Sequence, residues 1–223
     1  MSAAPWSFSK AKSFDTCPKQ FYHVTVLKEH PFKETEATRY GTEFHKACED
    51  YIGKGTELDA RFEFIKPTLD KLNAKPGKKV CEQKLGLTAN LEPCGFFDDD
   101  VWFRGIVDLA ILDEETGLGW IIDYKTGKSA RYADKGQLEL MALTIFKHYP
   151  KITKINAGLL FVIANDLIKE TYTFDDQHKL WEKWNSKYAM IEKAFENDVW
   201  NPRPSGLCRR FCPVTQCPHN GMN

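Results

Sequence analysis

The sequence predicts an α/β domain with a mixed central β-sheet flanked by helices. Segments with helical periodicity come first, followed by segments rich in β-forming residues, a helix, further strands and a long C-terminal helix. This order of elements is typical of α/β domains. The chain has 223 residues, of which 42% are hydrophobic, so it can bury a core that is stable without disulfides.

Four helices are expected in the N-terminal third. Ser7 and Ser9 are suitable N-caps for the first helix, and Pro18 suits the first position of the second. Cys17 should therefore lie at the joint between them. Pro67 should bend or split the fourth helix, because proline lacks the backbone N–H of a helix interior. The expected helices cover residues 7–16, 18–27, 37–52 and 57–73.

Strands are expected after this helical segment. Residues 78–89 and 101–112 are rich in β-forming side chains, and the apolar run within 117–127 stops at Asp123, so the three segments should form a meander. A helix should follow, then a buried strand with an antiparallel partner, and finally a long amphipathic helix. These elements are expected over residues 136–150, 155–165, 167–174 and 175–198.

Composition limits the class of protein. Lys plus Arg and Asp plus Glu are equal at 31 each, so any argument for nucleic-acid binding has to rest on local clusters of charge. The sequence contains no apolar run of about 18 residues and no signal-peptide pattern, so a cytoplasmic protein without a membrane segment is expected. Seven cysteines are an odd number, which favours metal binding over a complete set of disulfides. Cys48, Cys81 and Cys94 are expected to be buried or spare thiols.

Two strand-end carboxylates carry the clearest chemical signal. Asp108 and Asp123 each follow apolar strand residues, and carboxylates on neighbouring strands can converge on Mg²⁺ or Mn²⁺. Lys125 lies two residues after Asp123, so both side chains should point to the same face of the strand. A bound metal ion and a nearby ammonium group are suited to phosphodiester hydrolysis. The alternative is an ordinary ion pair at the ends of two strands.

Residues outside these strands add to the signal. His45 lies on the third expected helix, where a histidine by itself is more often a packing residue than a ligand. Gln137 opens the helix after the third strand and can hold a phosphate or orient Lys125 through its amide. Three basic residues follow the third strand, where a DNA backbone would have to lie, namely Lys128, Arg131 and Lys135.

Taken in order, these motifs resemble the PD-(D/E)XK nucleases, in particular the RecB-like branch that includes AddB-type nuclease domains and CRISPR-associated exonucleases. GTEFH resembles the G-x-x-x-H motif, GIVDLA the G-x-x-D strand, and IIDYKTGK the D-x-K signature with its usual continuation. GQLELM resembles the Q-x-x-x-Y helix, although Met141 stands where the family usually has tyrosine. The resemblance covers nearly the whole chain and implies a restriction-endonuclease-like core.

The resemblance implies a role for each matching residue. The implied catalytic residues are Asp108, Asp123, Lys125 and Gln137, and the implied ligands of a Mg²⁺ or Mn²⁺ ion are His45, Asp108, Asp123 and the backbone carbonyl of Tyr124. Glu82 occupies a place where relatives often have an acidic residue, but it aligns only loosely.

The implied function is that of a metal-dependent DNA exonuclease acting on single-stranded DNA or DNA ends, in recombination, repair or phage DNA metabolism. The small size and the ending CPVTQCPHNG resemble virus-encoded members of the family, which implies a phage origin and the host cytoplasm as location. No P-loop pattern occurs, so a helicase, recombinase or annealing protein would have to be another chain. The alternatives are a non-catalytic DNA-binding or assembly subunit that retains the nuclease fold and a structural zinc-bound interaction protein.

The C-terminal cysteines Cys208, Cys212 and Cys217 lie within ten residues and supply three of the four ligands that zinc or a cubane cluster usually needs. The resemblance implies that Cys17 is the fourth ligand and that the site holds a [4Fe–4S] cluster. The spacing departs from that of relatives, which have C-x-x-C followed by five residues before the last cysteine. A zinc site with the same thiols, or with His219 replacing one, and unpaired cysteines are the alternatives.

We expect one nuclease domain over residues 1–223. Within it, the four cysteines would join residues 1–30 to residues 198–223 as an N- and C-terminal subdomain. Such a link closes a loop of nearly the whole chain and restricts the unfolded state.

Overall fold

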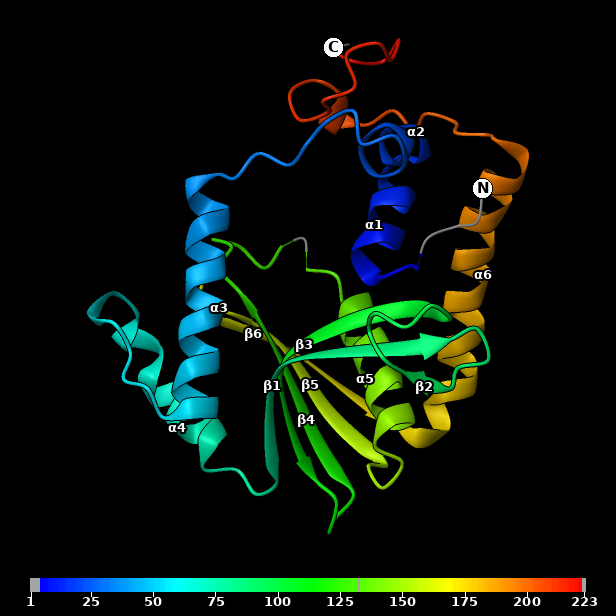
Figure 1. The fold of residues 1–223 in the computed structure, drawn as a ribbon. Helices are drawn as coiled ribbons and strands as arrows, with labels where there is room; N and C mark the ends of the chain where they lie inside the picture. The colour runs from blue at the N-terminus through cyan, green and yellow to red at the C-terminus, as the bar shows by residue number, and fades with distance from the viewer. Residues whose placement is uncertain (1–4, 132, 222–223) are drawn as a thin grey trace. The chain divides into compact units, whose positions relative to one another are not determined.

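The computed structural model describes residues 5–131 and 133–221 and confirms the α/β class (Figure 1). The chain divides into two compact units, one made of its two ends up to Lys33 and from Glu182 onward, the other of Glu34–Trp181. The larger unit carries the β-sheet, and the smaller unit carries the cysteines at both ends of the chain.

The six-stranded sheet has the order β2-β1-β3-β4-β5-β6. β4 and β5 are parallel and all other neighbours are antiparallel, which gives the expected mixed sheet. The short strand β2 forms within a segment predicted to be only a turn, and it pairs with the end of β1. The strands are β1 (Lys78–Thr88), β2 (Pro93–Cys94), β3 (Val101–Asp113), β4 (Leu118–Lys125), β5 (Lys154–Phe161) and β6 (Asp166–Thr173).

The helices follow the predicted order. The first expected helix begins after Ser7, whose side chain accepts the N–H of Lys10, and the second becomes a π-helix at Tyr22–Val26. Pro67 splits the fourth expected helix, because a 3₁₀ turn at Ala60–Ile65 precedes α4 and the proline lies in the first turn of α4. The α-helices are α1 (Phe8–Thr16), α2 (Pro18–Phe21), α3 (Glu36–Lys54), α4 (Lys66–Asn73), α5 (Gly136–His148) and α6 (Gln177–Asn197).

Two apolar clusters cover the faces of the sheet in the larger unit. On one face α5, which connects the parallel strands β4 and β5, packs its fully buried Leu138, Ala142 and Ile145 against the strands. On the other face, α3 and α4 enclose Phe44 and Leu69, which are both fully buried. Figure 1 shows α3 and α5 on opposite sides of the strands. The sheet is therefore a fixed platform between two helical layers.

Aromatic packing joins the two ends of the chain within the smaller unit. Trp200 stacks on Tyr22 with ring centroids 4.8 Å apart and on Phe21 at 6.1 Å. Lys187 forms an ion pair with Asp15, whose backbone carbonyl also accepts a hydrogen bond from Arg203. These contacts place the C-terminal segment against the helices that flank Cys17.

Gly77 and Gly55 provide a matched test of the close contact between the residue before β1 and the backbone of β3 at Leu112. Both have positive φ, 106° and 70°, but a Cβ at Gly77 would lie 2.6 Å from the Leu112 carbonyl oxygen, whereas a Cβ at Gly55 would meet nothing within 4 Å. We expect Gly55→Ala to cost about 1 kcal/mol and Gly77→Ala about 3 kcal/mol of unfolding free energy, because the steric clash adds to the strain. Urea denaturation measures both, and equal losses would contradict the clash.

Candidate active site

Helix α3 carries His45 close to the end of β4. Gly41 lies one turn before it, and a Cβ at Gly41 would lie 3.3 Å from the Thr126 hydroxyl oxygen. The helix can therefore approach the residues that follow β4 more closely than a larger side chain would allow. Consequently, His45 Nε2 lies 3.0 Å from the Tyr124 carbonyl oxygen and can donate a hydrogen bond to it.

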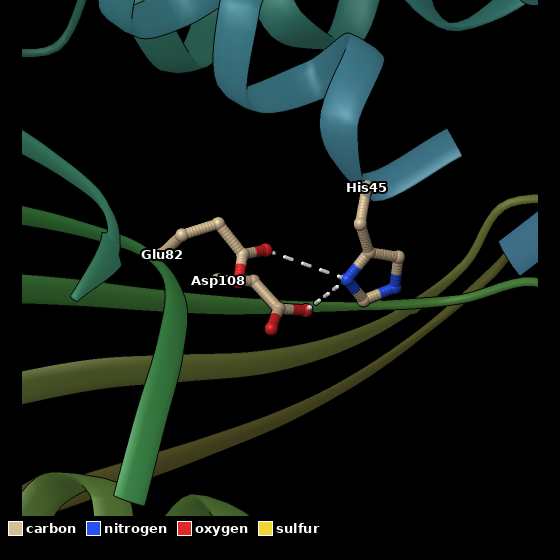
Figure 2. Close-up of side chains that lie close together, drawn as sticks. All are labelled: His45, Glu82 and Asp108. Carbon is tan, nitrogen blue, oxygen red and sulfur yellow. Dashed lines mark ion pairs between the residues drawn. The ribbon is translucent and has the colours of Figure 1, made fainter. Parts of the chain in front are cut away.

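The other ring nitrogen of His45 faces two carboxylates (Figure 2). His45 Nδ1 lies 3.4 Å from Asp108 Oδ2 and 3.7 Å from Glu82 Oε1. One ligand atom from each of the three residues lies within 4.8 Å of the other two. A nitrogen ligand and carboxylate oxygens are a suitable donor set for a divalent cation. The hydrogen bond at Nε2 orients the ring in the way that backbone carbonyls commonly orient metal-ligating histidines.

The backbone of β1 and β3 brings Glu82 and Asp108 to this point. Glu82 has a positive φ of 47°, which is uncommon for a residue with a side chain and distorts β1 locally. β3 and β4 pair as far as Leu109 and Ile122. Beyond that pair, Asp108 Oδ2 accepts the N–H of Tyr124 at 2.9 Å. The Asp108 side chain thus replaces the ladder bond at the position where the two strands separate.

Asp123, Lys125 and Gln137 form a second group beside the first. The Asp123 carboxylate is 1% exposed, and its Oδ2 lies 2.6 Å from the Lys125 ammonium. Gln137, at the start of α5, donates from its amide nitrogen to Asp123 Oδ1 and accepts from Lys125 Nζ at 2.8 Å. The amide therefore fixes both the carboxylate and the ammonium group.

Burial and mutual repulsion dominate the electrostatics of the carboxylates. Burial, and then the charge of Asp123, raise the pKa of Asp108 to about 7. Burial also raises the pKa of Asp123, although the Lys125 ammonium opposes this increase. For His45, burial lowers the pKa, but the nearby carboxylates of Glu82 and Asp108 outweigh this effect and raise the pKa. A cation bound among these groups would relieve the repulsion between the carboxylates.

Comparisons with known proteins identify the family of this chain. The family model of the PD-(D/E)XK nuclease superfamily matches residues 5–218. The chain belongs to this superfamily. The crystal structure of a putative exonuclease from Eubacterium rectale matches with a TM-score of 0.55 at 11% identity, covering 89% of this chain and 84% of that chain. This likeness shows a shared fold.

A second solved structure, SSO0001, matches with a TM-score of 0.46 at 10% identity, covering 99% of this chain and 89% of that chain. A TM-score of 0.46 is too low to define a shared fold. Among curated proteins no match is found.

The site residues that the sequence predicts are distributed over the two groups described above. His45, Asp108 and the Tyr124 carbonyl meet in the first group, and Asp123, Lys125 and Gln137 meet in the second. Asp123 is not one of the three residues whose ligand atoms lie within 4.8 Å of one another. Met141, which stands at the place of the usual tyrosine, is buried in the core beneath α5 and so is directed away from solvent.

Glu82 is the member of the site that the sequence did not assign. An acidic residue in the expected strand 78–89 was the available signal, but a single glutamate in a strand is usually a solvated surface residue. Its place beside His45 depends on the positive φ of its backbone, which no sequence pattern indicates.

The three predicted DNA-binding residues lie on the surface. Lys128 and Arg131 are exposed in the segment that follows β4. Lys135 is also exposed, but it forms an ion pair with Glu170, so part of its charge is neutralised. Because Glu170 lies on β6, this contact ties the start of α5 to the sheet edge.

An open groove with a volume of about 680 Å³ borders the candidate metal site. His45 and Glu82 line it together with three threonines, Thr38, Thr42 and Thr126. Hydroxyl groups of this kind can hydrogen-bond to phosphate oxygens. The groove therefore leaves His45 and Glu82 accessible from solvent.

The four predicted cluster ligands meet in the smaller unit. Cys17, Cys208, Cys212 and Cys217 line one pocket, and His219 lines it too. The Cys17 sulfur lies 3.5 Å from the backbone nitrogen of Gln20 and 3.4 Å from that of Arg203, which can both donate to it. Such N–H groups stabilise thiolates bound to a metal or cluster.

Within the part of the chain that the structure describes, no helix combines the length and the apolar character needed to cross a bilayer.

Binding of Mn²⁺ to the first group should be visible as thermal stabilisation. At a hundredfold excess over Kd we expect a gain of about 2.7 kcal/mol, or roughly 5 to 10 °C in Tm. Because the pKa of Asp108 is raised to about 7 and that of His45 is raised as well, the ion must displace protons from both residues at pH 6. The apparent affinity should therefore be at least about tenfold lower at pH 6 than at pH 8.

Asp108→Asn tests whether Mn²⁺ binds at this site, and Asp113→Asn is the matched control at an exposed position. We expect the first variant to lose the Mn²⁺ response and the second to keep it, since Asp113 caps a turn through Thr116 away from His45. An unchanged Mn²⁺ shift in Asp108→Asn would contradict the site.

Proposed function

We propose that this protein is a divalent-metal-dependent deoxyribonuclease that hydrolyses phosphodiester bonds of single-stranded DNA or DNA ends as an exonuclease. The observation that carries the proposal is the meeting of His45, Glu82 and Asp108 at one point, with Lys125 held nearby by Gln137. Membership in the nuclease superfamily supports the reaction class.

His45, Glu82 and Asp108 would hold Mg²⁺ or Mn²⁺. Asp123 and the Tyr124 carbonyl, which hydrogen-bonds to His45, match the remaining ligand positions of the family and would complete the site. When bound, such an ion supplies Lewis acidity toward a phosphate oxygen and lowers the pKa of a water molecule. The buried Asp123 carboxylate holds the Lys125 side chain in position through their ion pair. The Lys125 ammonium is then in place to offset negative charge that develops on the phosphate.

Gln137 acts as a positioning residue in this proposal. Its amide contacts Asp123 and Lys125 with opposite ends, so neither side chain can rotate without breaking a hydrogen bond. Preorganisation of this kind removes the reorganisation that a charged group would otherwise undergo during the reaction.

The alternatives make less use of these contacts. A non-catalytic assembly subunit has no need for a lysine paired with a carboxylate that is 1% exposed, since burying such a pair is costly. A zinc-bound interaction protein would need the cysteine site alone. The combination of both groups therefore supports an enzyme.

Asp123→Asn and Lys125→Ala should each lower kcat/KM for labelled single-stranded DNA by roughly a hundred- to thousandfold in Mn²⁺, because each removes charge from the reacting centre. Lys151→Ala is the matched control, since Lys151 is exposed and pairs with Glu114. Activity is measured as release of labelled nucleotides. Undiminished cleavage by both site variants would rule out the assigned site, and no cleavage by the parent protein would favour the assembly subunit.

We also propose a [4Fe–4S] cluster at Cys17, Cys208, Cys212 and Cys217, which all lie in the smaller unit, where the cluster would join the two ends of the single nuclease domain expected over residues 1–223. The four cysteines line one pocket, which supports a shared site. The choice of an iron–sulfur cluster over zinc rests on the resemblance to relatives that carry such a cluster, since thiolates bind both.

Anaerobically purified protein should be brown and contain about four iron atoms per chain. Cys17→Ser and Cys217→Ser should lose colour and iron, whereas Cys94→Ser should keep both because Cys94 lies in β2 of the other unit. Visible absorption and metal analysis measure the result. A colourless protein with one zinc ion per chain would overturn the cluster.

The biological setting belongs to the same proposal. A DNA exonuclease of this size would act in recombination, repair or phage DNA metabolism, in the cytoplasm of the cell or of a phage host. Strand separation or annealing would come from a partner such as a helicase, recombinase or annealing protein.

A further inference from the structure

One exposed strip of the sheet begins where the candidate metal site ends. On β1 and β3, Leu85 and Val107 point into the core cluster beneath α5. Side chains alternate along a strand, so their neighbours Lys84 and Ile106 point to the opposite face. That face is covered by α3 farther along β3, where Leu109 joins the core cluster of α3. Beyond the covered part Lys84 and Ile106 are exposed.

The strip combines cations and aromatic rings. Ile106 is 38% exposed and pairs directly with Lys84, and Arg104 follows on the same face of β3. Phe96 and Phe97, in the connection from β2 to β3, lie over these cations, and Phe97 is 72% exposed. We call these five residues the Phe97 strip.

A glycine and an aspartate hold the aromatic pair in place. A Cβ at Gly86 would lie 2.7 Å from the Gly95 carbonyl oxygen, so only glycine lets the β2–β3 connection approach β1 this closely. Asp98 then accepts the N–H of Gly95 at 2.6 Å and closes the turn that carries Phe96 and Phe97. The exposed position of Phe97 is therefore built into the backbone.

The two cations are available to a ligand. Lys84 Nζ lies 5.5 Å and the Arg104 guanidinium carbon 5.8 Å from the Phe97 ring centroid. Among the described residues neither cation has a carboxylate partner, and Arg104 Nε is buried without a hydrogen-bond partner. The positive charge of the strip comes from β1 and β3, which carry Lys84 and Arg104. The β2–β3 connection contributes the aromatic rings, and its own charged residues Asp99 and Asp100 are exposed and acidic.

We propose that the Phe97 strip binds the single-stranded part of the DNA substrate, with a base stacked on Phe97 and phosphates at Lys84 and Arg104. Cations that follow a backbone together with an exposed aromatic ring are the combination by which proteins hold single strands. Asp108 lies four residues from Arg104 on β3, or about 13 Å along an extended strand. A strand bound to the strip would thus lead to the proposed reacting centre, and in this respect the inference rests on the proposed function.

The test separates binding from cleavage. Affinity for a labelled oligothymidine and for a blunt DNA hairpin is measured by fluorescence anisotropy in EDTA, where a metal-dependent nuclease does not cleave. We expect Phe97→Leu to weaken oligothymidine binding about tenfold and hairpin binding less than twofold, since stacking needs an unpaired base. Phe32→Leu is the matched control, because Phe32 is 78% exposed, and it should leave both affinities unchanged.

Salt dependence tests the charged part of the strip. Lys84→Gln should reduce the slope of log affinity against log salt by about 0.7, the value for one contact to a single-stranded phosphate. Lys71→Gln, an exposed lysine on α4, should leave the slope unchanged. Unchanged oligothymidine affinity in Phe97→Leu, equal losses on hairpin and single strand, or no binding by the parent would overturn the inference. Parent cleavage in Mn²⁺ reports separately on the proposed function.

Discussion

The hydrogen bond from the Tyr124 N–H to Asp108 is the contact on which the rest of the site depends. It forms where β3 and β4 stop pairing, so it satisfies a backbone donor and orients a carboxylate at the same time. On one side of this contact the Tyr124 carbonyl holds His45, and on the other Asp123 is held by Lys125 and Gln137. Loss of the Asp108 side chain would therefore affect both groups.

The carboxylates of this site repel one another, and a bound cation would reduce this repulsion. Three carboxylates, those of Glu82, Asp108 and Asp123, gather around one histidine and one lysine at a partly buried position. Burial raises the pKa of both Asp108 and Asp123, and it raises the pKa of Asp108 to about 7, so without a cation the Asp108 carboxyl group is partly protonated at neutral pH. Relief of this repulsion would contribute to the free energy of binding a divalent ion. Because the ion replaces protons on these groups, metal binding is linked to proton release.

The smaller unit depends on aromatic packing and on its cysteines for stability. Its helices α1 and α2 are short, and aromatic contacts with Trp200 provide much of their packing. A four-cysteine site between Cys17 and the C-terminal segment would restrict the unfolded chain by an amount on the order of 5 kcal/mol, if the entropy model for cross-links applies. The cysteines are thus suited to stability, whereas the carboxylates are suited to chemistry.

The α/β class and the order of nearly all elements could be predicted from the sequence, because apolar periodicity is a local pattern. Polar residues at strand ends also indicated Asp108, Asp123 and Lys125 as candidates, whereas the proposed ligand role of His45 came from the resemblance to the nuclease family. The tertiary structure decided what local patterns do not contain: the strand β2, the role of Gly41 in bringing α3 close, and the place of Glu82 beside His45. The physical reason is that each depends on a contact between distant segments, and in the case of Glu82 on a backbone angle that its residue type disfavours.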